Sequence, residues 1–505
     1  MHQLKVKGIV NNSAEPDEGL SRRVVRGGAW VFALRITERA FSLIRLIILA
    51  RILAPHDFGL MGIALLTMAT LETFSETGFW AALIQKRGNV DAYLDAAWTV
   101  LILRGFLLFT VLYLIAPYAA IFFKAPQAKP IIQVIGLSVL IQAFTNIGVI
   151  YFHKELEFNK QFLYQLSGTL ANFIVAVSAV LILRSVWALV FGLLAGNIAR
   201  FVMSYLIHPY RPHLSSHLGK AKELWGFGRW VLGSSILVFL ITQGDDIFVG
   251  KLLGATMLGF YQIAYRISNM PATEITHVIS QVTFPAYSKL QDNLPKLREA
   301  YLKTLQLTAF LSFPIAGLIF VLAPDFTKIF LGEKWMPMVP AMQALAAWGL
   351  IRSIGATTGP IFQAVGKPGI NTKVQLAVLT LLAILIYPLS IRWGIVGTSL
   401  AVVFAGLVGD LIVAPIVIKA TRCGIWNFCG MISFPVINMA IILSSILLIE
   451  TYWIDSVRMP EFFLFIAIGV LGYFGLTYLF DKIFGYGVLA IIKENLASLW
   501  KKTDA

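Results

Sequence analysis

Residues Gly28 to Leu53, GAWVFALRITERAFSLIRLIILARIL, form an apolar stretch that is long enough to cross a bilayer yet carries charge near its centre. Each of its thirteen Leu, Ile, Phe and Val residues favours insertion by about 0.3 to 0.6 kcal/mol. Each central charge opposes insertion by roughly 2.5 to 3.5 kcal/mol, so this helix is not stable alone in lipid. At about 100° per residue, one face collects the polar side chains. These residues are Arg35, Glu38, Arg39, Ser42 and Arg45. That face must contact protein or water, and charges at bilayer depth mark functional sites.

The composition of the chain excludes a soluble globular protein. Of 505 residues, 58% are hydrophobic and only 13% are charged, and the mean hydropathy is +0.78. The net charge of +15 is attributed to cytosolic loops, where Lys and Arg collect, rather than to nucleic-acid binding. The polar start, MHQLKVKGIVNNSAEPDEGLSRR, lacks the apolar core of a signal peptide and is interpreted as a cytosolic tail.

Apolar runs of about 20 residues predict an all-α integral membrane protein with fourteen spans. The runs lie near residues 28–53, 58–83, 95–122, 131–151, 162–183, 186–207, 226–253, 257–284, 302–323, 338–363, 372–390, 393–418, 430–450 and 462–480. Lys and Arg are concentrated in alternate connections, which places the amino and carboxyl ends in the cytosol.

The domain organisation follows from a basic interval, HPYRPHLSSHLGKAKE (residues 208–223), that separates the sixth and seventh spans. The predicted parts are a cytosolic tail (1–25), a first lobe of six spans (26–207), a cytosolic linker (208–225), a second lobe of six spans (226–420), two further spans (421–484) and a cytosolic tail (485–505). The only cysteines, Cys423 and Cys429, match no metal-site spacing, and no metal or cofactor is expected.

An internal repeat supports two related lobes. A shift of 200 residues superposes LARILAPHDFGLMGIA (Leu49 to Ala64) on VGKLLGATMLGFYQIA (Val249 to Ala264), and a shift of 210 superposes LIQAFTNIGVIYF (Leu140 to Phe152) on LIRSIGATTGPIF (Leu350 to Phe362). Both lobes begin in the cytosol, so an axis along the membrane normal relates them, as in transporters with a central cavity between parallel repeats.

Opposite charges in the first two spans are expected to lie at equal depth. Because these spans are antiparallel neighbours, Arg35 is level with Glu76, and Arg39 is level with Glu72. Two interpretations stay open and are compatible: buried salt bridges that lock the helix pair, or groups that line the path of a solute.

Other intramembrane cations have no acidic residue at their depth. They are Arg45, Arg104, Arg200 and Arg352. The planar guanidinium suits phosphate oxygens and stays charged when buried, so several facing one cavity would form a receptor for an anionic headgroup. For Arg200 and Arg229 the simpler alternative, extension of the side chain to the interface, is favoured.

The second half carries its own intramembrane charges. Asp245 and Asp246 are expected to form a periplasm-side ion pair with Arg266 in the next span. Glu274 and His277, three residues apart and deeper, are candidates to carry a coupling proton. A satisfied polar contact is an equally good interpretation of that pair.

The segment from Arg26 to Gly88, with LARILAPHDFGLMGIA followed by ETGFWAALIQ, resembles the opening of the Wzx-type polysaccharide repeat-unit flippases of the MOP superfamily. WGFGRWVLGSSILVFLITQGDDIFVGKLLGATMLGFYQIAYRISNMP (Trp225 to Pro271) and LIRSIGATTGPIFQAVGKP (Leu350 to Pro368) resemble later spans of that family. The resemblance implies a V-shaped bundle of two six-helix lobes in the bacterial inner membrane, with spans one, two, seven and eight around a cavity. It also implies an undecaprenyl-pyrophosphate-linked oligosaccharide as substrate, with first-span cations near the pyrophosphate. Those cations are Arg35, Arg39 and Arg45.

The sequence therefore predicts a non-enzymatic flippase that moves a lipid-linked repeat unit to the periplasmic leaflet for surface polysaccharide assembly. A multidrug or metabolite antiporter of the same superfamily is one alternative, although its acidic cavity does not match the cation excess. A membrane-embedded enzyme of polysaccharide assembly is another, although such enzymes need a sizeable periplasmic loop. A third alternative is an added role as a scaffold protein in the polysaccharide assembly complex. A polysaccharide polymerase and a chain-length regulator are the expected protein partners.

Overall fold

The computed structural model of the chain describes residues 18–85, 90–155, 157–215, 219–270, 283–284, 286–367, 369–453 and 457–493. Within these ranges every regular element is a helix. The helices of the first half are α1 (Glu18–Ile52), α2 (Pro55–Phe74), α3 (Phe79–Gln85), α4 (Asp91–Phe122), α5 (Ala128–Ala143), η1 (Ile147–Val149), α6 (Ile150–Lys154), α7 (Phe158–Leu183) and α8 (Trp187–Ile207). Those of the second half are α9 (Gly219–Leu252), α10 (Ala255–Ser268), α12 (Leu294–Phe326), η2 (Thr327–Leu331), η3 (Glu333–Met338), α13 (Val339–Gly355), α14 (Gly359–Ala364), α15 (Gly369–Thr421), α16 (Ile425–Trp453) and α17 (Met459–Phe484).

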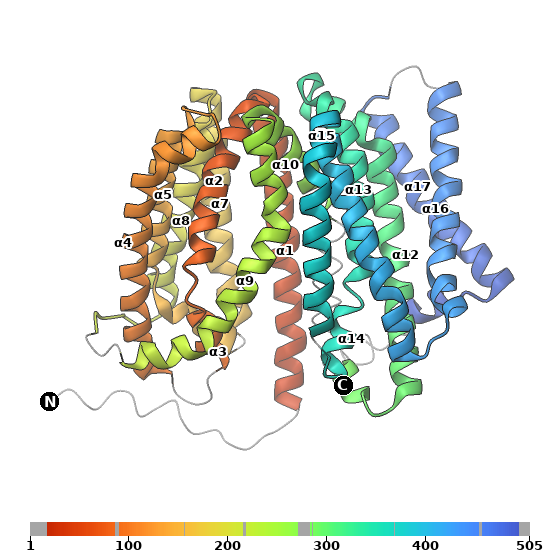
Figure 1. Cartoon of the computed structure of the whole chain (residues 1–505), viewed down its shortest axis with the longest axis horizontal. Helices are drawn as coiled ribbons and strands as arrows, with labels where there is room; N and C mark the ends of the chain where they lie inside the picture. The colour runs from red at the N-terminus through yellow and green to blue at the C-terminus, as the bar shows by residue number, and fades with distance from the viewer. Residues whose placement is uncertain are drawn as a thin grey trace. The chain divides into compact units, whose positions relative to one another are not determined.

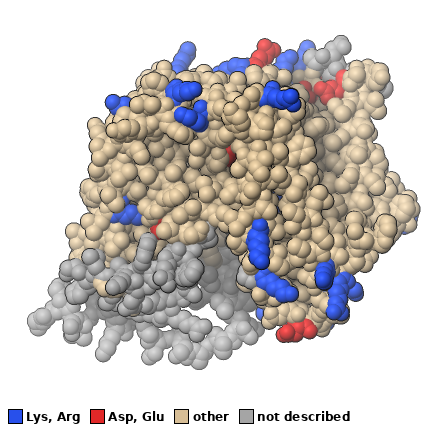
Figure 2. All heavy atoms as spheres, viewed as in Figure 1, with Lys and Arg blue, Asp and Glu red and all other residues tan. Residues whose placement is uncertain are grey.

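The helices have the length and composition of membrane spans. Among the described residues, eight helices are long and apolar enough to cross a bilayer, and a ninth span is formed if the bent pair α5 and α6 is counted as one. Figure 2 shows one face, on which Lys and Arg gather near the ends of the helices and a broad band between them is mostly uncharged. The all-helical membrane fold predicted from composition is therefore confirmed.

The chain divides into two compact units. The first comprises Met1–Leu53 and Ala64–Phe239, and the second comprises Ala54–Ile63 and Leu240–Ala505. In the first unit α7 packs against both α1 and α8, while α5 packs between α4 and α8 (Figure 1). In the second unit α12 packs against α13 and α16, and α17 covers α16. Each unit thus has its own helical packing.

The repeat found in the sequence reappears in the helix boundaries. Helix α1 ends at Ile52 and α2 begins at Pro55. Helix α9 ends at Leu252 and α10 begins at Ala255, so both boundaries recur after 200 residues. The bent pair α5 and α6, with an angle of 72°, corresponds at a shift of about 210 residues to the break between α13 and α14. The helix boundaries therefore agree with the sequence repeat at these two places.

In the second unit, the amino ends of α2 and α10 cross at two equivalent glycines. A Cβ atom added to Gly59 would lie 1.7 Å from the carbonyl oxygen of Ala255, and one added to Gly259 would lie 2.0 Å from that of Pro55. Next to this contact, His56 Nδ1 lies 3.3 Å from Thr256 Oγ1, its counterpart in the repeat. The contacts are reciprocal, so a local two-fold axis relates the two segments, and small residues permit the close backbone approach.

Two predicted spans are interrupted at the same end of the first unit. The span expected over 58–83 stops at Phe74 and resumes as α3 after Gly78, which has a φ of +64°. The span expected over 131–151 bends after Ala143. A third boundary, expected between 390 and 393, falls at Trp393 and Gly394, where the φ/ψ angles inside α15 are not helical.

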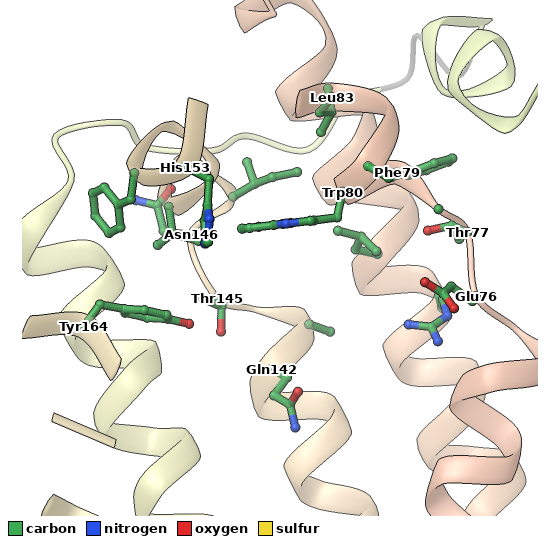
Figure 3. Close-up of a pocket in the computed structure, with 18 of the residues that line it drawn as sticks. Glu76, Thr77, Phe79, Trp80, Leu83, Gln142, Thr145, Asn146, His153 and Tyr164 are labelled. Carbon is green, nitrogen blue, oxygen red and sulfur yellow. The ribbon is translucent and has the colours of Figure 1, made fainter. Parts of the chain in front are cut away.

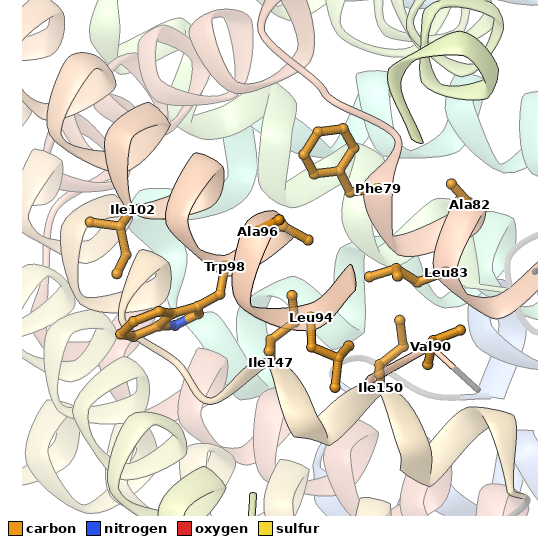
Figure 4. Packing of buried hydrophobic residues seen from close by; sticks show 11 residues of the cluster. Phe79, Ala82, Leu83, Val90, Leu94, Ala96, Trp98, Ile102, Ile147 and Ile150 are labelled. Atoms are coloured by element: carbon orange, nitrogen blue, oxygen red, sulfur yellow. The ribbon is translucent and has the colours of Figure 1, made fainter. Parts of the chain in front are cut away.

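A buried apolar cluster holds the interrupted segments in place. Phe79 and Leu83 of α3 pack with Leu94 of α4 and with Ile147 and Ile150 of the bend after α5 (Figure 4). The indole nitrogen of Trp98 donates to the carbonyl oxygen of Thr145 over 3.1 Å. Because the breaks are packed and hydrogen-bonded, they are fixed features of the fold.

Candidate functional site

A polar pocket in the first unit lies where α1, α7 and α8 meet. The α1 and α7 helices are parallel, because ring contacts of 5.2 Å join Trp30 to Phe162 and Phe41 to Phe173 at the same sequence separation. The pocket has a volume of about 180 Å³. Its lining residues are Glu38, Phe41, Ser42 and Arg45 of α1, Gly168, Thr169, Asn172 and Phe173 of α7, and Arg200 of α8. Three residues of the polar face of α1, namely Glu38, Ser42 and Arg45, therefore turn toward α7.

Guanidinium groups are held in this pocket by amide oxygens. Arg45 donates from Nη1 to Asn172 Oδ1, and Arg200 donates from Nη2 to Asn197 Oδ1 over 2.9 Å. Gly168 leaves room for Arg200, since an added Cβ would lie 2.7 Å from its Cγ atom. The side chain of Arg200 lies against Gly168 of α7 and lines the pocket. Its extension to the interface, favoured from sequence, stays a prediction.

Positive charge exceeds negative charge around the pocket. The carboxylate of Glu38 interacts electrostatically with Arg200, Arg35 and Arg39, in that order of strength. The lining of the pocket itself holds two guanidinium groups, those of Arg45 and Arg200, and one carboxylate, that of Glu38. Arginine remains charged in an apolar environment and presents a fork of donors, so this excess suits an anionic ligand such as a phosphate.

Arg104, predicted as a further phosphate ligand, lies at the carboxyl end of α2. Its Nε donates to the carbonyl oxygen of Ser75 over 2.8 Å, and its Nη2 donates to that of Glu72 over 2.8 Å. These carbonyls are left without helical partners because α2 stops at Phe74, and a basic side chain satisfies them. Arg104 thus stabilises the break in the second span, and a role in substrate binding stays a prediction.

The acidic residues of α2 lie beside Arg104. Among the described electrostatic contacts, the cation that interacts with the Glu72 carboxylate is Arg104, which also interacts with Glu76. The neighbours of Arg35 and Arg39 include Glu38. The two ion pairs expected across the first two spans stay predictions.

In the second unit, the aspartates of α9 accept hydrogen bonds from side chains of α10. Asp245 is 3% exposed and accepts a hydrogen bond of 2.7 Å from the hydroxyl of Tyr261. Asp246 accepts one of 3.3 Å from the amide of Gln262. Arg266 is exposed on α10, so its expected ion pair with the aspartates stays a prediction.

Arg352 lies at the end of α13, next to the same cluster. It interacts electrostatically with Tyr265, whose hydroxyl lies 3.4 Å from the indole nitrogen of Trp348. The structure therefore brings Arg352 near the α9 and α10 cluster of the second unit, whereas Arg45 and Arg200 share a pocket in the first.

Three predicted residues cannot be placed. Glu274 and His277 lie outside the described residues, as does the side chain of Arg229. In the part of the chain that the structure describes, no cluster of three or more His, Cys, Asp or Glu residues could hold a metal ion. Cys423 is buried and Cys429 is exposed, and both are free thiols.

The sequence reasoning missed the contribution of α7. Gln161, Gln165, Thr169 and Asn172 follow one another at intervals of four, four and three residues within an otherwise apolar span. This spacing places them on one face of the helix. The stripe could have been found in the sequence, but its members are uncharged, and only charged residues were matched between spans.

An all-helical membrane bundle with guanidinium groups held at polar sites between its helices has the features of a membrane transporter. The model of the polysaccharide biosynthesis protein family matches residues 48–340, more than half of the chain. The chain belongs to this family, and the predicted resemblance is confirmed.

Individual relatives agree with that assignment. The chain is 26% identical over 360 residues to the lipopolysaccharide biosynthesis protein WzxC of Escherichia coli K12, which covers 70% of this chain and 72% of that protein. It is 22% identical over 348 residues to the succinoglycan biosynthesis transport protein ExoT of Rhizobium meliloti 1021, covering 69% and 70%. Its fold is similar to that of the lipid II flippase MurJ in an inward closed conformation, with a TM-score of 0.75 over 91% of this chain and 99% of that chain at 16% identity.

Proposed function

We propose that the protein is a flippase that moves an undecaprenyl-pyrophosphate-linked oligosaccharide repeat unit from the cytosolic to the periplasmic leaflet. The transported unit would serve the assembly of a surface polysaccharide, such as O-antigen, capsule or exopolysaccharide. Family membership and the names of the relatives support a role in polysaccharide biosynthesis. No chemical reaction is required of the protein, which binds and transfers its substrate.

The observation that carries the proposal is the guanidinium-rich pocket between α1, α7 and α8. Moving a pyrophosphate with its sugars through hydrocarbon would cost on the order of tens of kcal/mol, whereas the polyprenyl tail is stable in lipid. A pocket with Arg45 and Arg200 in its wall replaces part of the hydration of the phosphate oxygens. Arg35, Arg39, Arg104 and Arg352 are proposed as further contacts along the path.

The proposed architecture has fourteen spans in two lobes of six, followed by two carboxyl-terminal spans, with both termini in the cytosol of a bacterial cell. The domain boundaries are those derived from the sequence. Transfer occurs by alternating access, in which the lobes expose the binding cavity first to one leaflet and then to the other. Asp245 and Asp246, with Tyr261, are proposed as a structural or gating cluster, and Glu274 and His277 as ion-coupling groups. A polysaccharide polymerase and a chain-length regulator are proposed partners.

Deletion of the gene followed by analysis of lipid-linked intermediates tests this function. Accumulation of complete repeat units on the cytosolic leaflet is expected. Loss of the units themselves, or loss of one sugar from them, would instead indicate an enzyme of assembly. Unchanged intermediates with increased sensitivity to organic cations would indicate an antiporter.

A further inference from the structure

A second and larger hollow of the first unit carries a different chemistry. It has a volume of about 480 Å³ and lies between the break after α2, α4, the bend after α5 and the start of α7 (Figure 3). Both interrupted spans contribute to it, because Thr77 and Trp80 follow the first break and Thr145 follows the second. The hollow exists because two helices stop short at the same end of the unit.

The walls of this hollow are anchored. Phe79, Leu83 and Ile147 belong to the buried cluster of Figure 4. Asn146 donates to the carbonyl oxygen of Tyr210 over 2.6 Å, and its Oδ1 accepts from the backbone nitrogen of Gly148 over 2.9 Å. A hollow held in this way is largely formed before a ligand arrives, which lowers the entropic cost of binding.

Aromatic rings and amide side chains face the hollow. Trp80 keeps 45% of its surface exposed although its ring meets that of His153 edge to face at 5.6 Å. Tyr164 projects into the space from α7 with its hydroxyl foremost (Figure 3). Gln142, Gln161 and Gln165 complete the polar lining, and within the described residues Gln161 Oε1 is buried without a hydrogen-bond partner. Buried polar atoms in proteins are normally satisfied, so this oxygen is available to accept a hydrogen bond from a ligand or a water molecule.

The charges at the hollow favour a neutral ligand. The lining holds Glu76, Arg104 and His153, and the carboxylate of Glu76 is opposite in sign to the guanidinium of Arg104. Arg104 is committed through Nε and Nη2 to the end of α2. Amides both donate and accept, which matches adjacent hydroxyl groups, and the electron-rich face of an indole suits the C–H face of a sugar ring.

One helix connects this hollow to the guanidinium-rich pocket. Gln161 and Gln165 of α7 line the hollow, and Thr169 and Asn172 on the same face line the pocket. Gln165 and Thr169 are separated by about 6 Å along the helix axis, given a rise of 1.5 Å per residue. A phosphate in the pocket and a sugar in the hollow would therefore be neighbours on one face of α7.

We propose that the hollow lined by Trp80, Tyr164 and the three glutamines is a subsite for a neutral hexose or N-acetylhexosamine residue of the substrate glycan. The inference rests on the proposed function, because the adjoining pocket is assigned to the pyrophosphate. The subsite selects the sugar, and the guanidinium pocket holds the phosphate that all such substrates share.

The test uses the purified full-length protein in lipid nanodiscs, with binding of free sugars followed by saturation-transfer NMR. The probes are glucose, galactose, N-acetylglucosamine and glucuronate, and inorganic pyrophosphate probes the other pocket. At least one neutral sugar should bind. Trp80→Leu should lower the affinity for that sugar by about tenfold, as expected for loss of a central aromatic contact. Trp426→Leu is the matched control, since Trp426 is 88% exposed on α16 and does not line the hollow.

Two further readouts keep the result interpretable. Tyr164→Phe retains the ring and should fold normally, as judged by its melting temperature. It should weaken sugar binding and leave pyrophosphate binding unchanged. The inference is overturned if no neutral sugar binds, or if Trp80→Leu and Trp426→Leu bind sugar alike. The gene deletion reports separately on the proposed function: cytosolic repeat units can accumulate without a sugar subsite, and a subsite can bind sugar without such accumulation.

Discussion

Replacement of Gly59 by alanine should destabilise the second unit at the crossing of α2 and α10. The added Cβ would lie 1.7 Å from the carbonyl oxygen of Ala255 and 2.4 Å from its carbon. Atoms of this kind do not approach closer than about 3 Å, so the two backbones must separate by more than an ångström along a packed contact. Overpacking of this kind costs about 1 to 3 kcal/mol, and the upper end is expected because the obstacle is backbone.

The assay is thermal unfolding of purified protein in detergent. Gly475→Ala is the matched control, because Gly475 is a helical glycine on α17 with no atom within 4 Å of an added Cβ. Alanine is more favourable than glycine in a helix by about 1 kcal/mol, so the Gly475→Ala protein should have an unchanged or higher melting temperature. Gly59→Ala should melt several degrees lower.

A double substitution checks the reciprocal geometry. Gly59 and Gly259 act at the same crossing, so once the first alanine has separated the helices, the second should cost less than it does alone. Full additivity, or a Gly59→Ala protein that melts like Gly475→Ala, would refute the local two-fold packing.

Three other predictions concern the first unit and the aspartate cluster. Arg45→Ala should abolish polysaccharide export without reducing protein abundance. Asn172→Leu should reduce export, because leucine cannot hold the Arg45 guanidinium in place. Surface glycan staining measures export, and immunoblots measure protein abundance. Arg104→Ala should lower protein abundance, because the carbonyl oxygens at the end of α2 lose their hydrogen bonds. Hydrogen bonds to a charged group contribute about 1.5 to 3 kcal/mol to the free energy of unfolding. Arg104→Lys should recover part of the abundance. Tyr261→Phe should destabilise the protein by about 1 to 3 kcal/mol because the buried Asp245 carboxylate loses a donor; a melting temperature equal to wild type would contradict the importance of this bond.

The all-helical membrane fold could be predicted from composition, and the repeat from two gapless alignments. Hydropathy decides which segments enter lipid, and these signals are local in the sequence. The break after α2 could not be predicted in this way, because Phe79 to Leu83 is as apolar as the helix before it. Gly78 follows the break with a positive φ, and Arg104 of α4 donates to the carbonyl oxygen of Ser75 at the break. The contact with Arg104 joins residues that are far apart in the sequence.

The polar face of α1 could be identified from the sequence, but its neighbour could not. Matching charges by depth selected the adjacent span, with Glu72 and Glu76, because consecutive helices often pack together. For Arg45, to which that matching assigned no partner, the described contacts include Asn172 of α7, a neutral residue more than a hundred positions away. Charge matching cannot find an amide, whereas the periodic polar stripe of α7 could have indicated it.

The most direct test of the central claim is a transfer assay in proteoliposomes that contain a polyprenyl-pyrophosphate-linked oligosaccharide. An impermeant enzyme that modifies the terminal sugar reports which molecules have reached the outer leaflet. Vesicles with the wild-type protein should expose the inner pool over time, whereas vesicles with Arg45→Ala should expose it no faster than protein-free vesicles. Equal transfer by the wild type and Arg45→Ala would contradict the assignment of the guanidinium-rich pocket to the pyrophosphate.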